Sequence, residues 1–190
     1  MCRDASFVLT KDKCYWSLLT DSHEEIIKEF ELHPDGTHGV NVLRVEITPP
    51  ENNYEAPAKE WEYKVDQDIL PKWADHKKDE KRARKALDEW MLARLIRTEV
   101  LELRNKKAIL LNGGKILEVK DGAILSVWGG TISAVRGGTI TAVCGGTISE
   151  VWGGTLVWYA DKDLPPIKND GAILVRRDGK ITLHTAEGGK

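Results

Sequence analysis

Residues 113–160 repeat with a period of eight. The six octads read GGKILEVK, DGAILSVW, GGTISAVR, GGTITAVC, GGTISEVW and GGTLVWYA. Each opens with Gly-Gly or Asp-Gly and has Ile or Leu at its fourth position, and five of the six have Val at the seventh. A short fixed period is typical of a structure in which one unit stacks on copies of itself. The period therefore constrains the architecture of this region strongly and its chemistry very little.

Two architectures accommodate the octads. In a β-solenoid each octad is a short strand plus a Gly-Gly corner, and one coil can hold two octads. The spacing of three between Ile and Val then requires a bend, because a straight strand would point them to opposite faces. In the alternative, an antiparallel β-meander, Gly-Gly is a hairpin loop. We favour the solenoid, because near-identical tandem units are the usual sign of stacking and a meander would put Glu150 on the Ile face.

The region before the octads predicts an α+β head. Ser22 and Glu25 fit a capping box at the start of a short helix that ends near Leu32. Helical spacing of apolar residues predicts a second, long helix over about residues 72–104. Alternating or aromatic-rich segments predict strands at residues 6–10, 15–19, 40–47 and 61–65.

These patterns divide the chain into two domains. We expect the α+β head over residues 1–111 and the all-β repeat domain over residues 112–190. The octad period breaks at residues 161–169 and then returns twice. A solenoid end exposes unpaired backbone, so we expect a cap or self-association there.

Composition and charge exclude several classes of protein. A net charge of -2 gives no overall field for nucleic acid, and no segment approaches the roughly 20 apolar residues that span a bilayer. The opening MCRDASFV has no apolar segment typical of a secretory signal. The three cysteines form no CxxC pair, and no GxGxxG or Walker loop occurs. We expect a cytoplasmic protein with no cofactor, metal, membrane contact or nucleic-acid partner.

The eighth octad position varies most and supplies the candidate binding residues. It holds Trp128, Arg136 and Trp152, residue types that are enriched in binding hot spots. If this position faces outward, these side chains form a docking surface for a protein partner. The alternative is that the two tryptophans pack against the head or a second chain.

Two segments of the head suggest chemistry. Removal of Met1 would leave Cys2 at the N-terminus, where its own amine could act as a base, as in a hydrolase or an amidotransferase. The adjacent Ser22 and His23 do not suggest a catalytic triad, because a triad forms across space and capping already explains the serine.

Asp66 and Asp68 follow a predicted strand, with His76 close behind. Carboxylates at a strand end can hold a metal ion, act as acid and base, or bind a small ligand. Turn formation and capping of the long helix is the simpler interpretation, and we therefore predict no metal site.

The chain resembles a group of uncharacterised bacterial and phage proteins. These share the head pattern MCxDAxFVLT, YWS, TDSHEEII, VxVEITPP and VDQDxLPxW, followed by varying numbers of GG(T/S)(I/V)xxV units. In this chain the segments lie at residues 1–10, 15–17, 20–27, 42–50 and 65–73 and in the octads. The resemblance implies a bacterial or phage origin and no particular activity.

The sequence thus predicts a non-catalytic interaction protein whose repeat domain is a rigid binding or assembly surface. One alternative is an N-terminal-cysteine enzyme that uses Cys2. Another is a protein that sequesters a small ligand in phage–host conflict, with a pocket between the head and the repeats.

Overall fold

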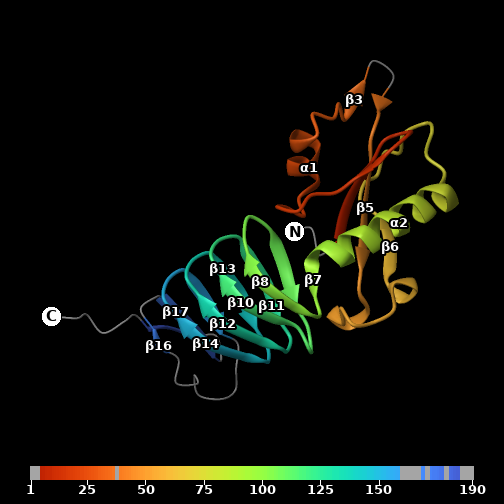
Figure 1. Cartoon of the computed structure of the whole chain (residues 1–190). Helices are drawn as coiled ribbons and strands as arrows, with labels where there is room; N and C mark the ends of the chain where they lie inside the picture. Colours follow the sequence, from red (N-terminus) through yellow and green to blue (C-terminus); the bar gives the residue numbers. More distant parts are fainter. Residues whose placement is uncertain (1–4, 37–38, 159–167, 170–171, 178–179, 185–190) are drawn as a thin grey trace. The chain divides into compact units, whose positions relative to one another are not determined.

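The computed structural model describes residues 5–36, 39–158, 168–169, 172–177 and 180–184. The chain forms two compact units, Met1–Ala93 and Arg94–Lys190. The first is a small α/β head and the second is a parallel β-solenoid (Figure 1). The predicted fold class is confirmed, and the meander is wrong, because the octad strands pair in parallel.

The head is built on a four-stranded antiparallel sheet of order β2-β1-β5-β6. A separate two-stranded hairpin is formed by β3 and β4, and two 3-10 helices precede β6. The bounds are β1 (Ala5–Leu9), β2 (Cys14–Tyr15), β3 (Asp35–Gly36), β4 (Gly39–Val40), β5 (Leu43–Thr48), η1 (Pro50–Asn52), η2 (Ala58–Glu60) and β6 (Glu62–Val65).

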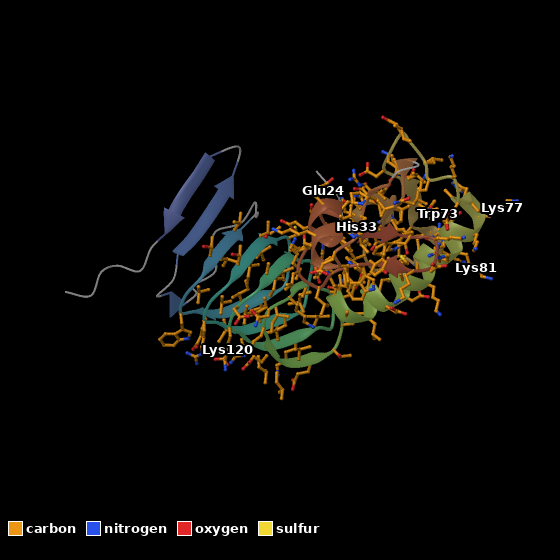
Figure 2. All side chains as sticks on the ribbon, turned by 90° about the horizontal axis from the view of Figure 1, so that it is seen from above. Glu24, His33, Trp73, Lys77, Lys81 and Lys120 are labelled. Carbon is orange, nitrogen blue, oxygen red and sulfur yellow. The ribbon has the colours of Figure 1, made fainter. Side chains whose placement is uncertain are left out.

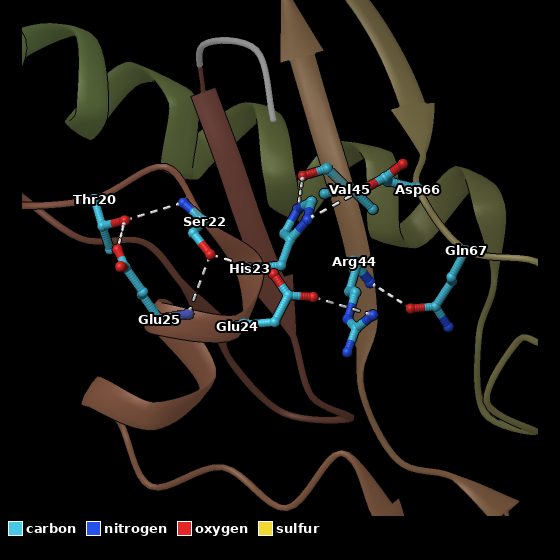
Figure 3. A network of polar contacts seen from close by, with 9 residues as sticks. All are labelled: Thr20, Ser22, His23, Glu24, Glu25, Arg44, Val45, Asp66 and Gln67. Atoms are coloured by element: carbon cyan, nitrogen blue, oxygen red, sulfur yellow. Dashed lines mark hydrogen bonds and ion pairs between the residues drawn. The ribbon is translucent and has the colours of Figure 1, made fainter. Parts of the chain in front are cut away.

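Helices cover both faces of this sheet (Figure 3). On one face, Ile26 and Ile27 of α1 (His23–Glu29) pack against Val8 and Val42. On the other, α2 (His76–Arg94) runs past Cys14. All five residues of β1 are buried, because both sets of alternating side chains meet a helix.

The second helix ends earlier than its sequence pattern predicts. Asp75 caps its start: the Asp75 carboxylate accepts from the Lys78 amide at 3.0 Å, and the Asp75 amide donates to Asp79 at 2.8 Å. The helix stops at Arg94, not near residue 104, and the unit boundary follows Ala93, not residue 111.

The residues beyond that point form the first strands of the solenoid. In residues 95–103, β-branched side chains and the alternating exposure of EVLEL favour a strand. The octad strand β10 offers them a parallel partner, with Val100 opposite Ile116. Tertiary pairing therefore overrides a local helical preference here.

The solenoid consists of two sheets. The 5-stranded sheet runs β16-β14-β12-β10-β8, and the 7-stranded sheet runs β18-β17-β15-β13-β11-β9-β7. The first holds β8 (Glu99–Leu103), β10 (Lys115–Val119), β12 (Thr131–Val135), β14 (Thr147–Val151) and β16 (Lys168–Asn169). The second holds β7 (Leu95–Ile96), β9 (Lys107–Leu110), β11 (Ala123–Val127), β13 (Thr139–Val143), β15 (Thr155–Trp158), β17 (Ala172–Arg177) and β18 (Lys180–His184).

Consecutive octads alternate between the two sheets, so one coil contains two octads. Ile116 pairs with Ile132, and Ile132 pairs with Ile148. Ile124 of the intervening octad pairs with Ile140 in the other sheet. Figure 1 shows the successive coils stacked along the unit.

The interior contains the isoleucine and valine columns that the repeat predicts. Within β12, Ile132 and Val135 are both fully buried, although three positions separate them. The same two positions are buried in the other octad strands β10, β11, β13 and β14, which requires the predicted bend, because a straight strand would point them to opposite faces. Buried Ile and Val from both sheets join one continuous core.

The solenoid stack ends differently from its middle. The strand β17 continues the parallel sheet beside β15, and β18 then pairs with β17 antiparallel. Most of the predicted break at 161–169 lies outside the described residues. Among the described residues, neither helix combines the length and apolar character that crossing a bilayer requires.

Candidate functional site

The octad residues predicted to bind lie at corners of the solenoid coil. Arg136 follows β12 and Trp152 follows β14, so both lie where the 5-stranded sheet turns toward the other sheet. Lys120, after β10, holds the equivalent position one coil earlier. Figure 2 labels Lys120 at the edge of the solenoid, where its side chain extends away from the ribbon. We call Lys120, Arg136 and Trp152 the basic corner after its two cations, which pair with the carboxylates of Glu102 and Glu118.

Contacts between neighbouring coils hold the basic corner in place. The Arg136 guanidinium pairs with Glu118 and lies over the Trp152 ring, 5.9 Å from its centroid. The Trp152 indole N–H donates to Glu150 at 2.8 Å, and the Lys120 ammonium lies 3.1 Å from Glu118. The side chains are thus fixed relative to one another while Arg136 keeps 54% of its side-chain surface exposed.

Trp128 lies at the opposite corner of the coil. It follows β11, a strand of the 7-stranded sheet, and Cys144 follows β13 one coil later. Trp128 is 41% exposed. Neither Trp128 nor Trp152 is buried in the solenoid interior, but the residues of the one predicted docking surface, Trp128, Arg136 and Trp152, are divided between two corners. The reason is the two-octad coil, which sends alternate octads to opposite sides.

In the head, the structure brings Asp66 and Asp68 together in one pocket. The pocket has a volume of about 400 Å³, and Arg44 and Gln67 also line it. The Gln67 side chain holds this loop to β5, because its amide oxygen accepts from the Arg44 amide at 2.8 Å and its amide nitrogen donates to Val42 O at 3.1 Å. A side chain thereby continues the strand pairing beyond the end of β6.

His76 does not join this pocket. Its ring contacts Tyr63 edge-on, 5.3 Å between centroids, and both belong to the α2 side of the sheet. Cys2 lies outside the described residues, so its reactivity stays a prediction.

The described cysteines are poor nucleophiles. Burial raises the pKa of the Cys14 thiol to about 12, and burial also raises the pKa of Cys144. A raised thiol pKa lowers the thiolate fraction at neutral pH, and the thiolate is the reactive form.

A buried histidine lies next to the acidic loop (Figure 3). His23, the first residue of α1, is 1% exposed. Its Nε2 lies 3.1 Å from the backbone oxygen of Val45, and its Nδ1 lies 3.3 Å from Asp66 Oδ2. Glu46 lies beside this pair, and one ligand atom of each of the three residues lies within 4.8 Å of the others.

The sequence explained His23 and Glu46 incompletely. The Ser22 hydroxyl does cap α1 by accepting from the Glu25 amide at 3.4 Å, as predicted. The Glu25 carboxylate, however, bonds to the Thr20 hydroxyl rather than completing the capping box. The alternation of residues 43–48 places Glu46 on the polar face of β5, and this was the only sequence signal that pointed to Glu46 as a candidate site residue. Nothing local showed that α1 would lay His23 on the same face.

The outer side of α2 is rich in lysine. Lys77 and Lys81 point away from the head (Figure 2). Lys81 also lines a hollow of about 560 Å³, together with Arg84 and Lys85. The Arg84 guanidinium is held by Glu80 at 2.8 Å, so acidic and basic groups are mixed on this surface.

No known protein-family model, curated protein or solved structure matches the chain.

Proposed function

We propose that this is a non-catalytic binding protein of bacterial or phage origin that acts in the cytoplasm, with the basic corner of its solenoid as the docking surface for a protein partner. The observation that carries the proposal is the stack of Lys120, Arg136 and Trp152 at successive coils. Each is attached to a coil whose interior is closed by buried Ile and Val. The variable side chains therefore sit on a fixed frame.

Preorganisation supports this assignment. Binding costs free energy when long side chains must be immobilised, about 0.5–1.5 kcal/mol for each. The contacts of Arg136 with Glu118 and Trp152 have already restricted these side chains in the free protein. Arginine and tryptophan are also the residue types that most often carry binding energy in interfaces.

The test separates the two corners. The double variant Arg136→Ser/Trp152→Ser removes the basic corner, and Trp128→Ser is the matched control at the same octad position on the other corner. Pull-downs from bacterial lysate, followed by binding measurements with the purified captured protein, should show loss of that protein by the double variant only. Light scattering would show whether a second copy of the chain is the partner.

Equal capture and equal mass for the double variant, Trp128→Ser and the wild type would remove the basic corner from consideration. Because the replaced side chains are exposed or partly exposed, we expect the melting temperature to change little, which keeps a loss of binding interpretable.

The sequestration of a small ligand is the second candidate, and the head pocket supports it. The pocket of about 400 Å³ is lined by charged and amide side chains together with apolar ones, which suits a small ligand that has both polar and apolar groups: Arg44, Asp66, Gln67 and Asp68, and Pro34, Val40, Val42 and Ile69. Thermal-shift screening with nucleotides and polar metabolites would test it, with Arg44→Gln as the variant expected to lose any shift. An unchanged shift in Arg44→Gln would place the ligand elsewhere.

A further inference from the structure

His23 occupies a position in which its protonation is dictated by its neighbours. Its Nε2 faces the backbone oxygen of Val45, which can only accept a hydrogen bond. Nε2 therefore carries a proton and donates it. In the neutral imidazole the remaining nitrogen, Nδ1, then presents a lone pair.

That lone pair faces another acceptor. Nδ1 lies 3.3 Å from Asp66 Oδ2, and an ionised carboxylate offers lone pairs only. Two acceptors at this distance need a proton or a cation between them. That is either a proton carried by the imidazole or by the carboxyl, or a metal ion bound by both residues.

Three features match a metal ion. The first is the hydrogen bond from Nε2 to a backbone oxygen, since a metal-binding histidine usually fixes its other ring nitrogen in this way. The second is spacing: bonds of about 2.0–2.2 Å place neighbouring ligand atoms on one ion about 3.0–3.5 Å apart. The separation of 3.3 Å between Nδ1 and Oδ2 lies in this range.

The third feature is the third donor. Glu46 brings a further carboxylate within 4.8 Å of both partners. This spread is wider than the roughly 4.2 Å across an octahedral ion with such bonds, so binding would draw the carboxylates inward. Asp66 keeps 43% of its side chain exposed and lines the head pocket, which gives an ion a route from solvent.

A buried hydroxyl beside the cluster lacks a partner. Ser6 lies directly opposite Glu46 in the pairing of β1 with β5 and is 1% exposed. Its Oγ has no hydrogen-bond partner among the described residues. Residues opposite each other in an antiparallel pair point to the same face, so this hydroxyl can serve Glu46 or a water on a bound ion.

We propose that the head binds one divalent transition-metal ion through His23 Nδ1 and the carboxylates of Glu46 and Asp66. One imidazole and two carboxylates without sulfur suit Mn²⁺, Fe²⁺ or Zn²⁺. This site is independent of the basic corner and of the partner proposed for it. It also lies outside what the sequence alone predicts, which is no metal site.

Mn²⁺ is the probe for the test. Tag-free full-length protein, stripped with a chelator, is titrated with Mn²⁺ while the signal of the free ion is followed by electron paramagnetic resonance. We expect one ion per chain, displaced by Zn²⁺, and nitrogen modulation in pulsed spectra from one imidazole. Asp66→Asn and Glu46→Gln should each weaken binding at least about tenfold.

Asp68→Asn is the matched control, because Asp68 lines the same pocket but is not part of the three-residue cluster. It should bind Mn²⁺ within about twofold of the wild type. The His23→Gln variant should lose the nitrogen modulation, and the carboxylate variants keep the test valid if that variant fails to fold.

Either of two results overturns the proposal. Absence of stoichiometric binding of both Mn²⁺ and Zn²⁺ would show that a proton joins His23 and Asp66. Equal weakening by Asp68→Asn and Asp66→Asn, or binding without nitrogen modulation, would show a loose attraction to the acidic loop.

Discussion

At the scale of single residues, one amide side chain positions the acidic loop of the head. Gln67 replaces a strand residue: it accepts from the Arg44 amide and donates both to Val42 O and to Ile69 O at 2.6 Å. Asp66 is placed by the same extension, because its amide donates to Arg44 O at 2.9 Å. The contact between Asp66 and His23 therefore depends on the hydrogen bonds that the neighbouring Gln67 side chain makes to the backbone.

We predict that Gln67→Glu destabilises the head by about 1–3 kcal/mol. In the wild type, the Gln67 amide nitrogen donates to the backbone oxygens of Val42 and Ile69. Glutamate keeps the shape of the side chain but places a carboxylate oxygen against these two acceptors. Urea unfolding of the two proteins measures the difference. Glu62→Gln, an exposed change in the preceding strand, is the control that should leave stability unchanged. A Gln67→Glu protein as stable as the wild type would contradict the role given to the amide.

Because the Cys14 thiol is buried, we expect the free energy of unfolding to fall at alkaline pH. Burial raises its pKa from 9.0 to about 12, so the folded state keeps the proton where the unfolded state loses it. This contribution to stability is complete below pH 9 and is lost as the pH rises toward 12. Linkage limits the loss to about 1.4 kcal/mol per pH unit for one group.

We expect Cys14→Ala to flatten the decline of unfolding free energy between pH 8 and pH 10.5, measured by urea titration at each pH. Tyr63, whose pKa burial also raises to about 12, adds to the decline only above its ordinary value of 10.0. A slope that is the same with and without the thiol would contradict the prediction.

At the scale of elements, the glycine corners determine how closely two coils approach. Gly138 has φ of +76°, and a Cβ added there would lie 2.6 Å from Gly122 O in the coil before it. Its neighbour Gly137 has the same problem, with 2.4 Å to Lys120 O. Gly138 must therefore be glycine both because of its positive φ and because a Cβ would clash with the neighbouring coil. Gly137 must be glycine because of the clash alone.

Gly138→Ala should therefore cost at least about 2 kcal/mol, from the left-handed backbone and from the clash with Gly122 O. Thr139→Ala, one residue later and exposed, is the control and should cost little. Thermal and urea unfolding report both. A Gly138→Ala protein with the stability of the control would mean that the coils can move apart without loss.

At the scale of the whole molecule, the two-octad coil makes the solenoid sensitive to the parity of its repeats. Successive octads enter alternate sheets, and the strands after the octads, β16 and β17, each join one particular sheet. Deleting a full coil of two octads leaves β16 and β17 next to the same sheets as before. Deleting one octad would bring each of these strands to the opposite sheet.

We predict that removing residues 129–144, one coil, leaves a folded protein with a modestly lower melting temperature. Removing only residues 129–136 should lower the melting temperature further, although fewer residues are lost, because β16 and β17 then reach the wrong sheets. Circular dichroism during heating distinguishes the two. An octad deletion as stable as the coil deletion would show that the terminal strands pair with either sheet.

The sequence by itself determined the repeat region. The octad period, the buried Ile and Val columns, the bend between them and the glycine corners all follow from local spacing, because each coil contacts only its neighbours. Capping of α1 by Ser22 was also local, since donor and acceptor lie within one turn.

Only the tertiary structure decided the end of α2, the division of Trp128 from Arg136 and Trp152, and the meeting of His23 with Asp66. Each depends on pairing or packing between separate segments of the chain. The helix α2 ends early because β8 pairs with β10, and the tryptophans are divided because each octad strand pairs with the strand two octads later. His23 meets Asp66 because α1 packs on the sheet. Periodicity shows which side of an element a residue occupies. It carries no information about which other element will cover that side, so the alternation of β5 could not show that α1 lays His23 against its polar face.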